Sequence, residues 1–313
     1  MKNPSKNESN MSKKIMPLLA LTILFATFGC NHQKPVEKTF STPDDAVVSL
    51  VDAVKTNNTA EVAAILGPDA DRAVASGDDV ADRNGRDLFL AAYFEKASLY
   101  GDENSKTLYI GSEEWPFPIP VVKDASGWRF DTASGLDELR YRRIGRNELS
   151  TIDTCYSYYD AQKEYAQKAH DGKPAGTYAQ KFVSDSGKQD GLFWTTKEGE
   201  EPSPLGDLVA EATAEGYTRS TDKPTPFRGY YFRILTAQGA NATGGERSYI
   251  VNGLMRNGFA LVAFPAEYGK SGIMTFLVNQ DGTVVEKDLG PDTATVAAQM
   301  NQFDPDSSWH RSE

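Results

Sequence analysis

The stretch that decides the fold is Trp115–Thr132, "WPFPIPVVKDASGWRFDT". Its prolines at 116, 118 and 120 cannot donate to a β-ladder at alternate positions, which predicts a sheet edge here. Two apolar runs around a tight turn then predict a hairpin that joins 119–123 to 128–131. The stretch therefore indicates a bent antiparallel sheet that ends in a hairpin.

Helical spacing upstream of this sheet predicts three helices. Thr42 is a good N-cap for the first helix, which we expect to end near Asn57. The second is "AEVAAIL" (60–66), and the third runs over 86–99 with Leu88 on its inner face. A polar loop is expected over 67–85, and the first strand is expected at "KTLYIG" (106–111).

Helices followed by a bent sheet resemble the cone-shaped nuclear-transport-factor-2-like (NTF2-like) fold. The resemblance covers Ser41 to about Ser134, and it gives an N-terminal α+β unit over 42–134.

Beyond this unit, the spacing predicts one long linking helix over 135–168, or two helices broken near Gly145. Residues 169–313 contain a short helix near 204–216, consecutive strand candidates from 229 to 290 and a short helix after Asp292. Short polar turns between the strands predict an antiparallel, β-rich C-terminal unit, so the fold class is α+β. A long helix that feeds such a sheet resembles the shape of pilin-like domains.

The pattern of residues 1–29 predicts a signal peptide. A basic segment precedes about 15 apolar residues, which is too short for a transmembrane helix. Gly29-Cys30 suits a lipoprotein cleavage site, although Thr27 and Phe28 depart from the usual pattern. We expect Cys30 to carry the lipid, a polar tether over 30–41, and a protein that faces the periplasm of a Gram-negative cell, at the outer membrane because Asn31 is not aspartate.

Charge limits the partners. The chain has a net charge of −11, and removal of the leader, with its net charge of +3, leaves −14. Nucleic acid is excluded as a partner on this balance, because binding phosphate requires lysine and arginine. The remaining thiol, Cys155, is interpreted as a small buried residue on the long helix.

Few residues suggest catalysis. The three histidines have no metal-ligand neighbours, so we predict no metal site and no cofactor. Gly269-Lys270-Ser271 lacks the first glycine of a phosphate loop and reads as a turn between strands. Adjacent acids at 113–114 and 200–201 are the remaining hydrolase candidates, and they are more typical of a solvated surface.

Aromatic side chains are the candidates for ligand contact. Trp115, Tyr231 and Tyr268 could line a groove that stacks on sugars or peptides. Tyr230 and Tyr231 are adjacent in a predicted strand, so one ring should point inward and the other outward.

Several blocks together resemble one bacterial family, domain of unknown function 2950, over about Phe40 to Trp309. The blocks are "WPFPIPVVKDASGWRFDTASG", "RRIGRNELSTIDTCYSYYDAQKEYA", "GYYFRILTAQG" and "FALVAFPAEYGKSGIMTFLVNQDGTVVEKDLG". The resemblance implies an exported, often lipid-anchored protein, and it implies no reaction.

These observations favour a non-catalytic binding or scaffolding module of the cell envelope, whose partner is an envelope protein or a small molecule. Two other hypotheses stay open: an envelope hydrolase that uses carboxylates in an N-terminal pocket, and a pilin-like assembly factor.

Overall fold

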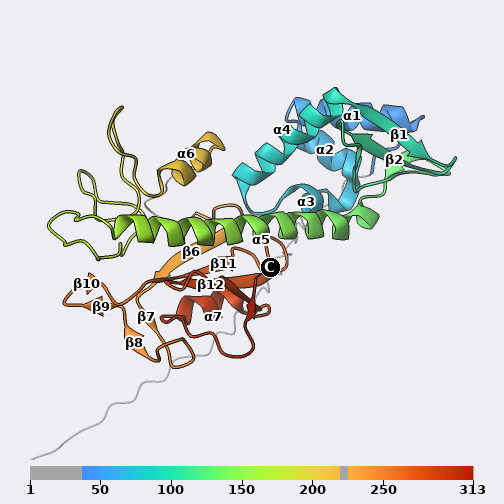
Figure 1. Cartoon of the computed structure of the whole chain (residues 1–313). Helices are drawn as coiled ribbons and strands as arrows, with labels where there is room; N and C mark the ends of the chain where they lie inside the picture. The colour runs from blue at the N-terminus through green and yellow to red at the C-terminus, as the bar shows by residue number, and fades with distance from the viewer. Residues whose placement is uncertain (1–36, 219–224, 313) are drawn as a thin grey trace, which may run out of the picture. The chain divides into compact units, whose positions relative to one another are not determined.

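A computed structural model describes residues 37–218 and 225–312, and the elements are labelled in Figure 1. The predicted leader and most of the tether, including Cys30, lie outside the described residues. The described residues belong to one compact unit of mixed helix and antiparallel sheet, which confirms the α+β class. In the described part of the chain, no helix is both long enough and apolar enough to cross a membrane.

Helices cover the N-terminal sheet. They are α1 (Pro43–Lys55), α2 (Thr59–Leu66), the short 3₁₀ turn η1 (Gly67–Asp69), α3 (Ala70–Val74) and α4 (Asp79–Glu95). The side chain of Thr42 accepts a hydrogen bond from the backbone N–H of Asp45, so it caps α1 as predicted. Leu50, Ile65 and Phe130 are among the side chains of this N-terminal core.

The prediction of a loop over 67–85 was wrong, because this stretch contains η1, α3 and the first turns of α4. Asp78 caps α4 by accepting hydrogen bonds from the N–H groups of Val80 and Ala81. The helix therefore begins at Asp79, seven residues before the expected start at Arg86. The prediction that Leu88 faces inward was also wrong, since its side chain is 68% exposed and Phe89 packs against the core instead. Leu88 and Phe89 are neighbouring apolar residues about 100° apart around the helix axis, so the sequence offers two possible buried faces.

The N-terminal sheet is antiparallel, in the order β1-β2-β4-β5. Its strands are β1 (Ala97–Gly101), β2 (Ser105–Ile110), β3 (Trp115–Pro116), β4 (Val121–Asp124) and β5 (Gly127–Phe130). The predicted hairpin is confirmed with Val121 opposite Phe130, whereas β1 was missed and assigned to the end of a helix. Pro116 lies at an edge as expected, because β3 pairs with β2 alone, while Pro118 and Pro120 lie between β3 and β4, outside the ladder.

The long helix α5 (Thr132–Tyr165) is continuous through Gly145, so the alternative of two helices was wrong. It begins at Thr132, three residues before the expected start. A side chain at Gly135 would lie 2.8 Å from the carbonyl oxygen of Pro118, so glycine allows the first turns to pack on the proline-rich stretch. The hydroxyls of Thr151 and Thr154 each donate to the carbonyl four residues earlier, which satisfies them inside the buried face.

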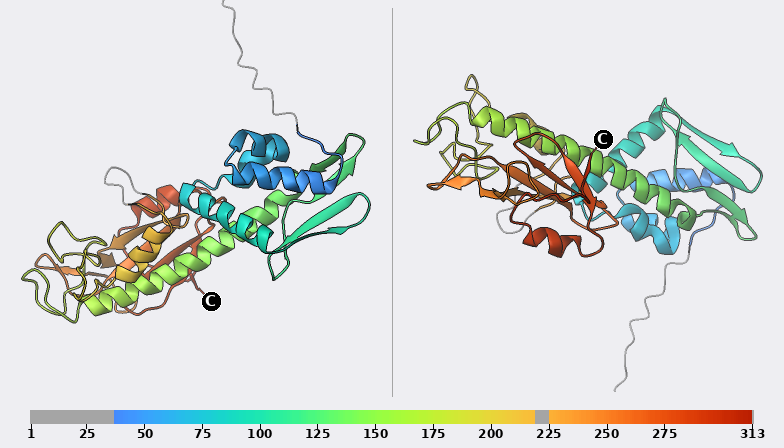
Figure 2. Two further views of the ribbon diagram at one scale, coloured as in Figure 1. Left: turned by 90° about the horizontal axis from the view of Figure 1, so that it is seen from above. Right: turned by 60° about the horizontal axis from the view of Figure 1, so that its bottom comes forward.

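Further along, α5 lies on the C-terminal sheet, where buried Tyr158 donates its hydroxyl to the carbonyl of Ala260. This antiparallel sheet has the order β14-β13-β12-β11-β6. The sheet lies between α5 and α7 (Figures 1 and 2). Its strands are β6 (Tyr230–Leu235), β11 (Ala260–Pro265), β12 (Met274–Asn279), β13 (Val285–Asp288) and β14 (His310–Arg311), and α7 spans Thr293–Gln299.

Shorter elements complete the C-terminal half. They are α6 (Gly206–Ala214), the paired strands β7 (Ala237–Gln238) and β8 (Arg247–Ser248), and the paired strands β9 (Ile250–Val251) and β10 (Leu254–Met255). The large apolar core of this half includes Leu261, Val262 and Phe276, which are fully buried.

Candidate functional site

A hollow of about 230 Å³ lies between α4 and α5, close to the C-terminal end of α6. One wall is a single face of α4, whose residues follow each other at helical spacing. The other wall is α5, and the floor is formed by residues that precede β6. The lining residues are Ala81, Asn84, Gly85, Leu88, Arg146, Asn147, Ser150, Glu215, Tyr217 and Arg228.

The floor is built on a tight turn that leads into β6. Phe227 pairs with Tyr230 across two residues with positive φ, Arg228 at 48° and Gly229 at 81°. Left-handed backbone at both central residues is the geometry of a type I′ turn. A side chain on Gly229 would lie 2.6 Å from the amide nitrogen of Asn147, so only glycine lets this turn approach α5.

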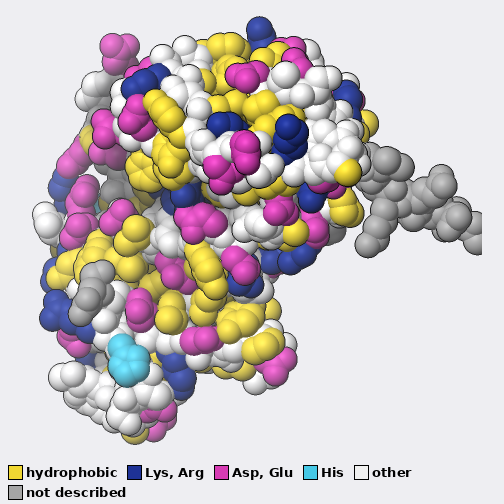
Figure 3. Space-filling view, turned by 90° about the vertical axis from the view of Figure 1, so that its right-hand side faces the viewer, with side chains coloured by type: hydrophobic (Ala, Val, Ile, Leu, Met, Phe, Trp, Pro, Cys, Tyr) yellow, Lys and Arg dark blue, Asp and Glu magenta, His cyan; other side chains and the backbone are white. Residues whose placement is uncertain are grey.

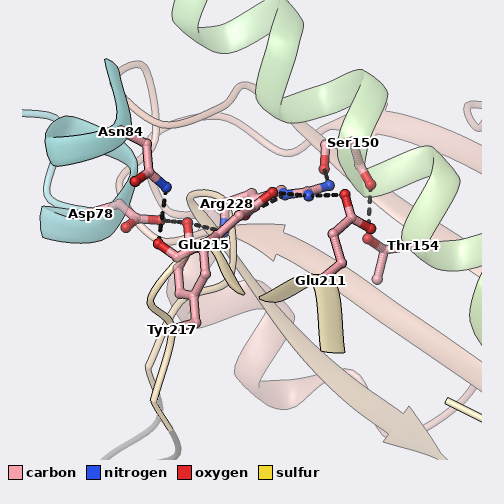
Figure 4. Close-up of polar contacts among 8 residues, drawn as sticks. All are labelled: Asp78, Asn84, Ser150, Thr154, Glu211, Glu215, Tyr217 and Arg228. Carbon is pink, nitrogen blue, oxygen red and sulfur yellow. Dashed lines mark hydrogen bonds and ion pairs between the residues drawn. The ribbon is translucent and has the colours of Figure 1, made fainter. Parts of the chain in front are cut away.

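Arg228 is held by three side chains from two helices and the segment that follows α6 (Figure 4). Its Nη1 donates to the hydroxyl of Ser150 at 3.0 Å, and its Nη2 donates to Glu211 at 2.6 Å. Its Nε donates to Glu215 at 3.2 Å, and Nη2 forms a second bond to the same carboxylate. The bidentate pair with Glu215 raises the pKa of Arg228 above its ordinary value, so the guanidinium is permanently charged.

Asp78 joins α4 to the turn below the hollow. Its Oδ1 caps α4, while its Oδ2 accepts from the hydroxyl of Tyr217 at 2.8 Å and from the N–H of Gly229 at 3.1 Å. The residue is only 5% exposed, and four donors occupy its two oxygens. A carboxylate saturated in this way stabilises the local structure and has no free lone pair with which to abstract a proton.

Tyr217 belongs to the floor, and Asn84 on the α4 wall is bonded to the floor. The Tyr217 hydroxyl also accepts a hydrogen bond from the N–H of Arg228, and Asn84 donates to the carbonyl of Glu215 at 3.1 Å. Burial, and then the hydrogen bond to Asp78, raise the pKa of Tyr217 well above its ordinary value. Tyr217 therefore remains a neutral phenol at physiological pH, so the arrangement suits binding better than proton transfer.

The three aromatic candidates from the sequence do not line this hollow. Trp115 is on β3 and is 62% exposed. Tyr231 is half-buried on β6, with its ring 5.7 Å from that of Phe264, while Tyr230 is fully buried, as the predicted alternation requires. Tyr268 lies in the turn between β11 and β12 and donates its hydroxyl to Asp288 at 3.2 Å. Their role in ligand contact stays a prediction.

The other motifs have structural explanations. Gly269-Lys270-Ser271 is the predicted turn between strands, with Lys270 paired to Glu267. Glu114 and Glu201 are exposed and paired with Lys96 and Lys168.

The remaining candidates for chemistry are the thiol of Cys155 and possible metal ligands. Cys155 is fully buried on α5, and burial raises the pKa of its thiol, so it is an inert core residue as predicted. Among the described residues, no cluster of three or more histidine, cysteine or acidic side chains could hold a metal ion.

The sequence interpretation missed Asp78, Arg146, Ser150, Tyr217 and Arg228. One signal was present, because "RYRRIGR" (140–146) concentrates arginine in an acidic chain. The other residues come from distant segments, since Ser150 and Arg228 lie 78 positions apart and Asp78 and Tyr217 lie 139 apart, and no local pattern links these segments.

Comparison with protein-family models matches residues 37–312 to the family described as "Protein of unknown function (DUF2950)". Comparisons with curated proteins and with solved structures gave no significant match.

Proposed function

Because the chain belongs to the DUF2950 family, which has no described function, we propose a role from the chain itself: a non-catalytic ligand-binding protein of the cell envelope. The hollow between α4 and α5 is its binding site. The observation that supports this role is the state of the floor, where Arg228, Asp78 and Tyr217 are fixed by one another before any ligand arrives. Pre-organised polar groups around a small cavity reduce the entropic cost of binding.

The proposal also covers the cellular location of the protein. The leader and Cys30 support a lipid-anchored protein that faces the periplasm, at the outer membrane of a Gram-negative cell. We expect Cys30→Ser to move the protein from the membrane fraction to the soluble fraction. Retention of the variant in the membrane fraction would contradict an anchor at this cysteine.

The ligand test uses the anchored protein, gently extracted from its own envelope, and native mass spectrometry. We expect a bound small molecule on the wild-type protein and its loss from Gly85→Leu, whose side chain would fill the hollow, since nothing lies within 4 Å of the added Cβ. Gly145→Leu is the matched control, because this glycine is also helical with open space around it but does not line the hollow. Equal occupancy in all three proteins would exclude the hollow as the site.

Two finer likenesses belong to this proposal. An NTF2-like N-terminal half and a pilin-like C-terminal half are supported by helices packed on a bent sheet and by a long helix packed on an antiparallel sheet. Under the pilin-like alternative, the outward face of α5 would contact a partner protein. Tyr141 and Leu149 on that face are 57% and 63% exposed.

A further inference from the structure

Four arginines lie within seven residues of α5, at 140, 142, 143 and 146, in a chain of net charge −11. Three of them have partners within the protein. Arg140 pairs with Asp137, Arg142 pairs with Glu138, and Arg143 donates to the carbonyls of Ala73 and Ala75. The fourth, Arg146, is exposed and lines the hollow, and no carboxylate of the described residues pairs with it.

Unused hydrogen-bond donors gather on the same side of the hollow. Ser150 lies four residues after Arg146, on the same face of α5, and its hydroxyl accepts from Arg228 while its own hydrogen has no acceptor among the described residues. Arg228 uses four of its five N–H groups in the bonds described above, which leaves one on Nη1 beside Ser150. Arg228 is shared by the carboxylates of Glu211 and Glu215, of which only Glu215 lines the hollow.

The rest of the lining is largely apolar. Ala81, Gly85 and Leu88 present methyl, hydrogen and isobutyl groups from α4, and Tyr217 contributes from the floor. The hollow thus combines a wall that is apolar except for Asn84 with unused hydrogen-bond donors and, among the described residues, one guanidinium without a carboxylate partner. A guanidinium recognises planar carboxylates and phosphates through paired N–H groups.

We propose that the hollow binds a small amphipathic anion, whose carboxylate or phosphate group is bound by Arg146 and Ser150 and whose apolar body lies against α4. This inference rests on the proposed function, because it names the ligand class of the same site. Arg146 is the residue that selects the anion, and the α4 wall selects the apolar body.

The experiment is calorimetric titration of the full lipidated protein in phosphatidylcholine nanodiscs, with empty nanodiscs as the blank. The probes are phenylacetate, phenyl phosphate and neutral 2-phenylethanol, with acetate and inorganic phosphate as anions that lack an apolar body. We expect the aromatic anions to bind about tenfold more tightly than the alcohol, since charge-assisted hydrogen bonds are roughly twice as strong as neutral ones. The tighter of the two aromatic anions identifies the head group.

Arg146→Gln should remove most of this preference and leave the binding of 2-phenylethanol unchanged. Arg140→Gln is the matched control, because Arg140 lies on the same helix and has a surface ion pair with Asp137. Its affinities should equal those of the wild-type protein, and far-ultraviolet circular dichroism of both variants checks the fold.

The possible failures are distinguishable. If 2-phenylethanol binds as tightly as the anions and Gly85→Leu blocks it, the hollow is a binding site and the anion preference is wrong. If acetate binds as tightly as phenylacetate, the apolar wall has no role and the amphipathic class is wrong. If the wild-type protein binds none of the five probes, both the inference and the proposed binding site are overturned.

Discussion

The hollow between α4 and α5 differs in an informative way from a second hollow at the loop end of the C-terminal sheet. The second is larger, about 440 Å³ against about 230 Å³. Its lining includes Asn241, Thr243, Asn279, Asp281 and Phe303, and its single charged lining residue is an acid. There, Asn279 donates to Asp281 at 3.2 Å and accepts from its N–H at 3.0 Å, so these groups satisfy each other locally.

The smaller hollow is made by segments that are far apart in the sequence. Asp78 reaches Gly229 across 151 positions, and Asn84 reaches the carbonyl of Glu215 across 131. Its lining also retains donors without acceptors, whereas the second hollow presents an acid that is exposed to solvent. Under the proposed function, the ligand is bound in the smaller hollow, because its polar groups and not its volume would select the ligand.

The largest expected effect on stability is that of replacing Asp78, which is part of the smaller hollow's support and has no contact with the second hollow. Asp78→Ala removes an N-cap worth about 1 kcal/mol. It also leaves the Tyr217 hydroxyl and the Gly229 N–H without their acceptor, at about 1 kcal/mol or more each. We expect a loss of about 3 kcal/mol in the free energy of unfolding, measured by urea titration.

Asp281→Ala at the second hollow is the comparison variant. Asp281 is exposed and accepts one long hydrogen bond from Asn279, so we expect a change within about 0.5 kcal/mol. Equal losses for the two variants would break the contrast between a structural junction and a solvated loop.

The next largest effect is the pH dependence that Tyr217 gives to the free energy of unfolding. Its folded pKa is raised, so the stability that it contributes is present below the unfolded pKa of about 10 and is lost as the pH rises above that value. Tyr217→Phe should cost about 1 kcal/mol at pH 8, because two hydrogen bonds are lost. Above pH 10, its unfolding free energy should fall less steeply than that of the wild-type protein, by about 1.4 kcal/mol per pH unit.

Urea titrations at pH 8 and near pH 11 measure this difference. Tyr156→Phe, at an exposed position on α5, serves as the control and should follow the wild-type protein at both values. Parallel curves for wild type and Tyr217→Phe would mean that the phenol under the hollow is not held by Asp78.

The smallest effect compares two glycines. Gly85 is helical and lies beside open space in the smaller hollow, so Gly85→Ala should stabilise the protein by about 0.8 kcal/mol. A Cβ on Gly239, near the second hollow, would lie 2.2 Å from Cγ of Asp304, whose carboxylate accepts from the N–H of Asn241. Gly239→Ala should therefore destabilise by about 1 kcal/mol. Thermal unfolding measures both, and destabilisation by Gly85→Ala would show that the hollow is not open at this residue.

Much of the fold could be predicted from local pattern. The strands β11 and β12 are continuous apolar runs, the hairpin at β4 and β5 has a clear turn between two apolar runs, and α5 is a long stretch without proline. The start of α4 and the strand β1 were missed because their periodicity is weak. The alanine, valine and acidic residues of 67–85 suit a loop as well as a surface helix.

The candidate site was less predictable than the fold. Trp115, Tyr231 and Tyr268 were chosen by residue type, yet these three side chains lie on β3, on β6 and in a turn. Arg146 and Ser150 could have been placed on one face of a helix from their spacing, but the sequence does not show that Gly85 and Arg228 lie opposite.

The sequence by itself determined the first helix, the long helix, the β4–β5 hairpin, the main C-terminal strands and the family, because propensity and hydrophobic period act over a few residues at a time. Only the tertiary structure decided which polar groups are paired and which remain free. Asp78, Arg228 and Tyr217 meet because Gly229 has no side chain to keep β6 away from α5. Arg146 and Gly85 line the same hollow, and no carboxylate of the described residues pairs with Arg146. Such contacts depend on distances between segments that are set by packing, which no local pattern records.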